Sequence, residues 1–196
     1  MYPDVELDET DKTTAQANQN FSKLTQLEEV DLSYNAILSG LPDMFASFKN
    51  LRKLTLHECK LTSLPESLSK LTQLEELNLS FNDFSHGLPD VISRLNHLTK
   101  LTLIYCQLTS LPESFSKLTQ LQEVDLSYNE FSAGLPDVFA SLGRSRILTL
   151  DECQLTTLPE RFIFVSESVT VSLTSTSSGY KLWYNWIWYS WMWYMY

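Results

Sequence analysis

The amino-acid sequence predicts a solenoid of six stacked repeats, each of which contributes one short β-strand. An apolar frame recurs at steps of 23 or 24 residues through most of the 196-residue chain. Within each copy, apolar and polar residues alternate with the two-residue period of a strand that has one wet face. A Leu-Pro pair then turns the chain, because proline has no N–H group and fixes φ.

The frame in the first copy is Leu27-x-x-Val30-x-Leu32-x-x-Asn35. The five later copies begin at Leu51, Leu74, Leu98, Leu121 and Ser145. One repeat has about eight inward apolar groups, each worth ~2 kcal/mol on burial. Ordering its residues costs on the order of 35 kcal/mol. A single repeat therefore cannot fold alone, and neighbouring repeats must stack to add burial and inter-strand hydrogen bonds.

The residue that closes the frame alternates between two types. It is Asn35, Cys59, Asn82, Cys106, Asn129 and Cys153. An Asn amide at an inward bend can satisfy backbone groups of adjacent turns that would otherwise be buried unpaired. Cysteine is small and tolerates burial, so the same place in the other repeats indicates a structural role. A redox or metal role is the alternative, but the 47-residue spacing is not that of a metal motif, and three cysteines cannot close a disulfide framework.

The frame L-x-x-L-x-L-x-x-N/C-x-L, followed by L-P, resembles the leucine-rich-repeat family. The resemblance covers residues 21–164, as six repeats. It implies an α/β solenoid: a curved horseshoe segment with a parallel β-sheet on the concave face and loops or short helices on the convex face. The chain looks like the intracellular repeats of Ras-pathway regulators and of receptor-like or Roco-type signalling proteins.

The full period is 47 residues, because two kinds of turn alternate. The longer repeats carry Gly-Leu-Pro-Asp from Gly40, Gly87 and Gly134, and the shorter ones carry Ser-Leu-Pro-Glu from Ser63 and Ser110. We expect the glycines to absorb the extra residue at positive φ, which glycine adopts without steric cost. A ligand role for them is the alternative.

The two ends depart from the repeat. Residues 1–20 are acidic and polar, which predicts disorder and no secretory signal. A degenerate capping repeat is expected at residues 165–176, with a strand near 169–173 that covers the open sheet edge. Residues 177–196 are a linker and an aromatic low-complexity tail that holds all five Trp. Three interpretations of this tail stay open: it has no evolved role, it lies at a membrane interface, or it extends the cap. Both ends suggest a fragment of a longer array.

Composition narrows the function. The 24 acidic and 14 basic residues give a net charge of −10, which argues against nucleic acid and favours a basic partner surface. No phosphate-binding glycine loop is present, and the three histidines fall on different faces, so we expect no enzyme, cofactor or metal site. The absence of Cys-rich caps favours the cytoplasm.

Two columns of residues across the predicted strands are candidate sites. The first is Glu29, Lys53, Glu76, Lys100, Glu123 and Ile147. Its opposite charges form a cross-strand ladder, which neutralises the sheet surface or contacts a partner. The second is Tyr34, Glu58, Phe81, Tyr105, Tyr128 and Glu152. Its four aromatics either contact a partner, since aromatics are enriched at interface hot spots, or pack under the adjacent loop. The candidate partner-binding residues are Tyr34, Lys53, His57, Phe81, Lys100, Tyr105 and Tyr128.

These observations predict a protein-interaction scaffold or adaptor that binds a partner protein on the concave face in intracellular signalling. A sensor fragment of a larger signalling enzyme, or a membrane-peripheral protein anchored by its aromatic tail, are the alternatives. Six strands offer a face of roughly 400 Å², whereas a standard interface needs about 800 Å² per partner. The chain alone would therefore bind weakly, use its rim, or belong to a longer solenoid.

Overall fold

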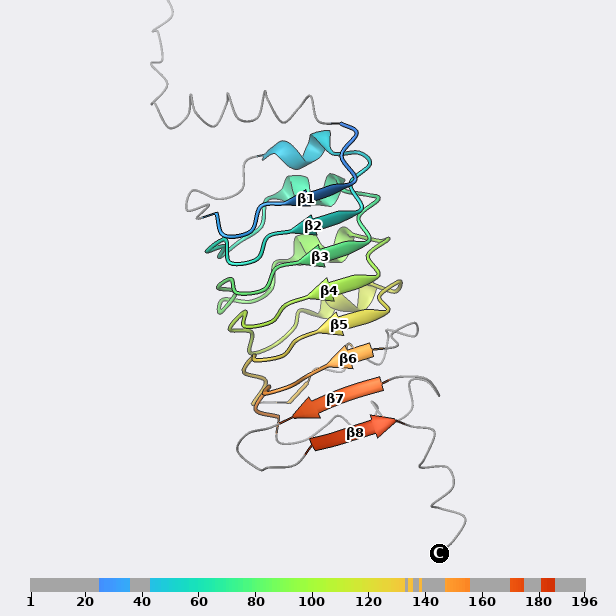
Figure 1. Ribbon diagram of the computed structural model, residues 1–196. Coiled ribbons are helices and arrows are strands. Elements are labelled where there is room, and N and C mark those ends of the chain that lie inside the picture. Colours follow the sequence, from blue (N-terminus) through green and yellow to red (C-terminus); the bar gives the residue numbers. More distant parts are fainter. Residues whose placement is uncertain are drawn as a thin grey trace, which may run out of the picture.

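The computed structural model describes residues 25–35, 43–132, 134–135, 138, 147–155, 170–174 and 181–185. The described residues contain one sheet of eight strands that lie side by side in chain order (Figure 1). The first seven strands are parallel, and the last is antiparallel to its neighbour. The predicted curved solenoid with a parallel sheet is therefore confirmed.

The strands of the six repeats are three residues long. They are β1 (Glu29–Asp31), β2 (Lys53–Thr55), β3 (Glu76–Asn78), β4 (Lys100–Thr102), β5 (Glu123–Asp125) and β6 (Ile147–Thr149). Their central residues meet in register: Leu54 pairs with Leu77, and Leu77 pairs with Leu101. All three are at most 1% exposed, so each repeat shelters the leucines of the next. The stacking that the sequence requires is present.

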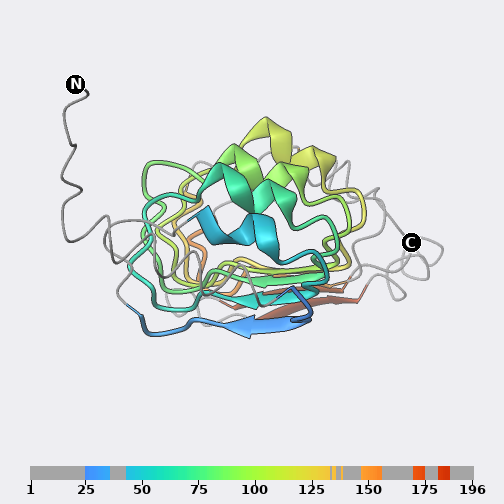
Figure 2. The ribbon, with the colours of Figure 1, turned by 90° about the horizontal axis from the view of Figure 1, so that it is seen from above.

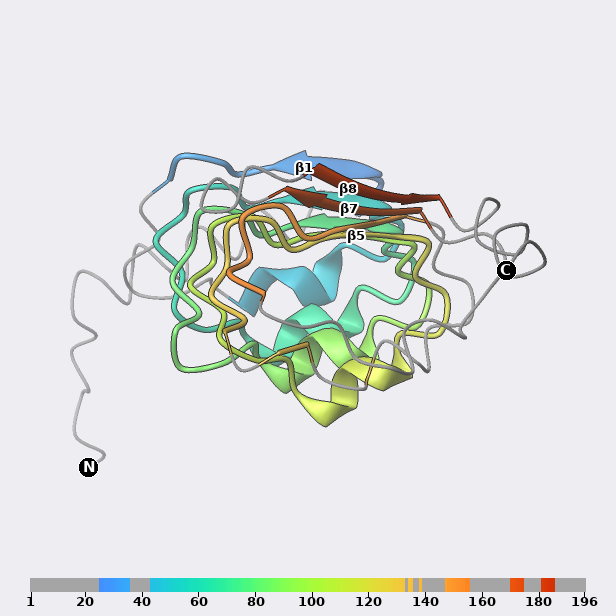
Figure 3. The ribbon, with the colours of Figure 1, turned by 90° about the horizontal axis from the view of Figure 1, so that it is seen from below.

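Short 3-10 helices return the chain on the other side of the core. They are η1 (Asp43–Ser47), η2 (Glu66–Lys70), η3 (Asp90–Arg94) and η4 (Glu113–Lys117). Views along the stack show these helices on the side opposite the sheet (Figures 2 and 3). The last three begin directly after a proline, whose fixed φ suits a helix start. The short helices expected on the convex face are confirmed.

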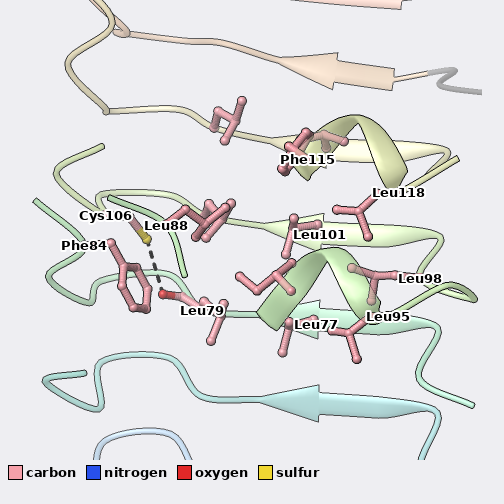
Figure 4. Close-up of a cluster of buried hydrophobic side chains, with 14 of the residues drawn as sticks. Leu77, Leu79, Phe84, Leu88, Leu95, Leu98, Leu101, Cys106, Phe115 and Leu118 are labelled. Atoms are coloured by element: carbon pink, nitrogen blue, oxygen red, sulfur yellow. Dashed lines mark hydrogen bonds between the residues drawn. The ribbon is translucent and has the colours of Figure 1, made fainter. Parts of the chain in front are cut away.

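One hydrophobic core fills the space between the sheet and the helices (Figure 4). Leu77 and Leu101 reach it from the strands, while Leu98 and Phe115 reach it from the returning chain. The largest fully buried side chains are Phe45, Phe48, Phe84, Phe115 and Phe131. Because the buried side chains of successive repeats form one continuous cluster, the stability of the array depends on contacts between repeats.

The asparagine turns satisfy buried backbone groups, as the sequence predicts. Oδ1 of Asn82 accepts the N–H of Cys59 at 3.1 Å and of Leu61 at 2.9 Å. Its Nδ2 donates to the carbonyl of Leu56 at 2.8 Å and of Leu79 at 2.7 Å. The equivalent amide one 47-residue unit later makes the same four kinds of bond. Each of these asparagines thus ties its own repeat to the preceding one.

The cysteine turns make a weaker connection. Sγ of Cys106 donates to the carbonyl of Leu79 at 3.3 Å (Figure 4), and Cys59 and Cys153 make the equivalent bond at 3.1 Å. All three thiols are free and buried. Burial raises the pKa of the Cys106 and Cys153 thiols to about 12, so they stay neutral. Their environment is that of structural cysteines.

The two repeat types place their left-handed residues differently. Gly87 and Gly134 have φ of 107° and 93°, as expected for the longer repeats, and Gly40 lies outside the described residues. The shorter repeats have Lys60, Gln107 and Gln154 at φ between 54° and 57°, directly after the cysteine. The extra residue of the longer repeat is therefore accommodated at a glycine.

Two further strands continue the sheet. β7 (Thr170–Thr174) pairs in parallel with β6, where a strand near residues 169–173 is expected. β8 (Lys181–Asn185) pairs antiparallel with β7. No strand is expected from the sequence at these residues. The expectations for residues 1–20 and for the Trp-rich end lie outside the described residues. The described part of the chain has no helix that is long and apolar enough for a membrane span.

Candidate protein-interaction face

The concave face consists of the outward side chains of the strands and of the turn that follows each strand. The backbone register aligns Glu29, Lys53, Glu76, Lys100, Glu123 and Ile147 across neighbouring strands. We call these six residues the charge column. Nζ of Lys53 lies 3.8 Å from Oε2 of Glu76, and Nζ of Lys100 lies 2.9 Å from Oε2 of Glu123. Both candidate lysines therefore form ion pairs with glutamates of the neighbouring strand.

Five rings form a continuous row beside the charge column. We call Tyr34, His57, Phe81, Tyr105 and Tyr128 the aromatic row. Successive ring centroids are 5.1, 4.9, 5.1 and 4.5 Å apart, and the last two rings are stacked nearly parallel. These are favourable aromatic separations. The structure therefore brings five of the seven predicted partner-binding residues into one contiguous group.

The composition of this row differs in one position from the column read off the sequence. The repeat frame aligns Glu58 with the aromatics, but the ring of His57, one residue earlier, lies between Tyr34 and Phe81. Frame alignment missed this position because it compares equivalent residues, whereas a neighbouring side chain can reach the same place.

The aromatic row is exposed. The exposed fraction is 72% for Tyr34, 44% for Phe81, 49% for Tyr105 and 44% for Tyr128. The rings pack on one another, and the described residues do not bury them under a loop. The same four residues have φ between 53° and 62°, a conformation that costs a non-glycine residue about 1–2 kcal/mol. Backbone geometry alone does not favour an aromatic here, so the exposed rings themselves need an explanation.

The concave face is acidic. The strands and the turns that follow them carry two lysines, Lys53 and Lys100, against eight carboxylates: Glu29, Asp31, Glu58, Glu76, Glu123, Asp125, Asp151 and Glu152. A hydrogen bond from the Ser33 hydroxyl lowers the pKa of Asp31, with a further contribution from the Ser33 backbone N–H. This carboxylate is therefore ionised at neutral pH. The summed field favours a basic partner surface.

The described residues do not gather possible metal ligands into one cluster. They contain no group of three or more His, Cys, Asp or Glu that could hold a metal ion. His57 belongs to the aromatic row, His86 lies beside Ser85, and His97 faces the carbonyl of Thr72 at 2.7 Å. The three imidazoles thus lie on separate elements, and the described thiols are buried.

Comparison with known proteins settles the family. The family model described as "Leucine rich repeat" matches residues 25–84, 49–108 and 96–155. The chain belongs to the leucine-rich-repeat family. Proteins of this family are generally protein-interaction modules. The Ras-regulator or Roco-like subtype stays a prediction, and no curated protein matches this leucine-rich-repeat chain.

Solved leucine-rich-repeat structures share the fold. One protein of Leptospira interrogans is 29% identical, with a TM-score of 0.73 over 80% of this chain and 39% of its own. The leucine-rich-repeat domain of the type III effector XopL is 22% identical, with a TM-score of 0.69 over 89% and 62%. Internalin C2 of Listeria monocytogenes is 22% identical, with a TM-score of 0.65 over 79% and 64%. The chain therefore spans less than two thirds of each.

Proposed function

We propose that this leucine-rich-repeat chain is a scaffold or adaptor module that binds a partner protein on its concave face and has no catalytic activity of its own. The observation that carries the proposal is the aromatic row. It places five adjoining rings on an acidic sheet surface, and four of them are strongly exposed. Tyrosine in particular is enriched among residues that dominate binding energy at interfaces.

The dimensions of the row suit a protein ligand. Four centroid steps of 4.5 to 5.1 Å carry the rings across five repeats. A continuous strip of that length contacts several residues of a partner at once. Because the strands alone offer only about half the area of a standard interface, we infer that the partner also contacts the turns at the rim.

The experiment measures the affinity of a captured partner. The immobilised chain is used to isolate binding proteins, and one of them is purified. Its dissociation constant is then measured for the native chain and for a Tyr105→Ala/Tyr128→Ala variant. The matched control, Lys70→Ala/Lys117→Ala, changes two exposed residues on the convex helices η2 and η4. We expect the tyrosine variant to bind roughly 30-fold more weakly and the control to bind as the native chain does.

The circular dichroism spectrum and melting temperature of both variants verify that the array stays folded. A tyrosine variant with native affinity, or an equal loss in the convex control, would contradict concave-face binding. The candidate lysines receive the same test through Lys53→Met and Lys100→Met. We expect smaller losses from these, because both ammonium groups are exposed and already paired within the sheet.

We further infer that this binding occurs in the cytoplasm, in intracellular signalling. The support is chemical: the three described cysteines are free thiols, as in proteins of reducing compartments. A fluorescent fusion observed in cells, with markers for the secretory pathway, tests the compartment. Signal that coincides with those markers would contradict the proposal.

A further inference from the structure

A hollow of about 110 Å³ opens on the concave face over β4, β5 and β6. It is lined by the outward side chains of Lys100, Thr102, Glu123, Asp125, Ile147 and Thr149, together with the buried residues Leu101 and Val124. Pockets for small organic ligands have volumes of about 300 Å³ or more. The hollow is thus too small for such a ligand and is comparable in size to a single amino-acid side chain.

The charge column changes its pattern at this hollow. Glu76 lies between Lys53 and Lys100 in the register of the sheet. Glu123 lies between Lys100 and Ile147. Ile147 thus occupies the position that holds a lysine, Lys100 or Lys53, in the two preceding 47-residue units. The alternation of acid and base therefore lacks its third cation. Ile147 is 43% exposed, so an apolar surface replaces the ammonium group.

The carboxylates of the hollow create a field that favours a cation. The hydrogen bond from Lys100 to Glu123 raises the pKa of the Lys100 ammonium group, and the charges of Glu123, Glu76 and Asp125 add to this effect. Oδ1 of Asp125 accepts the N–H of Ser127 at 3.0 Å and its hydroxyl at 2.6 Å. Both of these bonds use the same oxygen, so Oδ2 of this carboxylate has the capacity to accept a further donor.

We propose that the hollow receives an arginine or lysine side chain of the partner protein, with its alkyl stem on Ile147 and its cationic head on the carboxylates of Glu123 and Asp125. The partner would thereby supply the charge that Lys53 and Lys100 supply in the earlier units. Long basic side chains commonly bury their stems on apolar surface while the charged head meets polar groups. This inference rests on the proposed function and specifies the partner's chemistry at one position.

The test uses peptides of defined chemistry. The probes are acetyl-Gly-Ser-Arg-Ser-Gly-amide, its lysine analogue, and a citrulline analogue that keeps the shape of arginine without its charge. The reporter is the NMR signal of the Val124 methyl groups, because Val124 lines the hollow and is unchanged in every variant. We expect the two cationic peptides to shift this signal saturably and the citrulline peptide to bind about tenfold more weakly or not at all.

Two variants separate the hollow from general attraction to an acidic surface. Ile147→Lys restores the lysine of the repeat, and we expect it to weaken binding of the arginine peptide about tenfold or more. Ile147→Met keeps an uncharged apolar side chain at this position and should bind as the native chain does. Since residue 147 is substantially exposed, the fold should tolerate both changes, which thermal unfolding verifies. Equal shifts from the citrulline peptide, or native affinity in Ile147→Lys, would overturn the proposal.

The affinity of the captured partner for the variants tests the role of the hollow separately from the proposed concave-face binding. A partner that loses affinity in both Tyr105→Ala/Tyr128→Ala and Ile147→Lys supports both proposals. A partner that depends on the tyrosines but binds Ile147→Lys with native affinity leaves the concave-face function intact and overturns the role of the hollow.

Discussion

The asparagine repeats and the cysteine repeats have the same strand and the same core, but they connect to the preceding repeat in different ways. The amide of Asn82 makes five hydrogen bonds, of which three reach backbone groups of the preceding repeat. A cysteine thiol makes one clear bond of this kind, to a carbonyl. The difference matters because the thiol is a weak donor and a poor acceptor for backbone N–H groups.

The backbone of the asparagine repeats compensates for what the thiol lacks. The N–H of Phe84 donates to the carbonyl of Cys106 at 3.0 Å, and the N–H of Phe131 donates to Cys153 at 3.1 Å. The main-chain carbonyl of the cysteine thus accepts a backbone N–H of the preceding asparagine repeat. The residue that follows the cysteine, Gln107 or Gln154, has a left-handed backbone conformation. Two turns with complementary hydrogen-bonding needs explain why the period is 47 residues and why the two kinds are not interchangeable.

The largest predicted effect comes from removing an asparagine amide. Asn82→Ala leaves the buried N–H groups of Cys59 and Leu61 and the carbonyl of Leu56 without this partner. We expect the free energy of unfolding to fall by about 3–5 kcal/mol, whereas Cys106→Ala should lower it by about 1 kcal/mol. Urea unfolding followed by circular dichroism measures both values. Equal losses would mean that the two turns depend equally on their side chains.

Substitutions at the left-handed positions should change the stability in opposite directions in the two repeat types. Gly87→Ala should destabilise the array by about 2 kcal/mol through φ alone, because a Cβ there meets nothing within 4 Å. Gln107→Gly removes the strain of a side chain at φ 57° but gives the unfolded chain more freedom. We expect a net change between zero and a gain of about 1 kcal/mol. Thermal unfolding of the pair tests this, and a destabilising Gln107→Gly would argue against strain at that turn.

Alkaline pH should weaken the cysteine turns selectively. The folded chain raises the pKa of the Cys106 thiol from 9.0 to about 12, so the neutral form is favoured by folding. The associated stability is complete below the pKa of the unfolded thiol and is lost as the pH rises from 9 toward 12. At pH 10 the loss is about 1.4 kcal/mol per thiol. The stability advantage of the native chain over Cys106→Ala, about 1 kcal/mol at pH 8, should therefore fall by about 1.4 kcal/mol at pH 10, so that the variant becomes slightly the more stable of the two. A difference that stays constant between the two pH values would contradict this prediction.

The smallest effect is expected from the exposed links between the two repeat types. Lys100→Met removes the ion pair with Glu123, whose side chain is 43% exposed. We expect a loss of about 0.5 kcal/mol or less, which should vanish in about 1 M salt because of screening. Unfolding at low and high salt measures it. A loss comparable to that of Asn82→Ala would show that the surface ladder, and not the buried amides, ties the repeats together.

Most of the fold could be predicted from the sequence because the same apolar frame occurs in six consecutive repeats. The register of the charge column, the convex short helices and the asparagine hydrogen bonds are all consequences of equivalent positions in equivalent turns. The ring of His57 in the aromatic row does not follow, since a side chain one residue earlier fills the place of Glu58. The hollow beside Ile147 also required the structure, because the sequence shows the missing lysine but not the space around it.

Hydroxyl-radical footprinting of the chain with and without its purified partner tests concave-face binding most directly. Tyr34, Phe81, Tyr105 and Tyr128 are exposed, so all four should be oxidised readily in the free chain. His86 and His97 are also exposed but lie outside the strands and serve as internal controls. We expect the partner to protect the row and to leave both histidines as reactive as before. Unchanged oxidation of the row, with protection elsewhere, would contradict binding at this face.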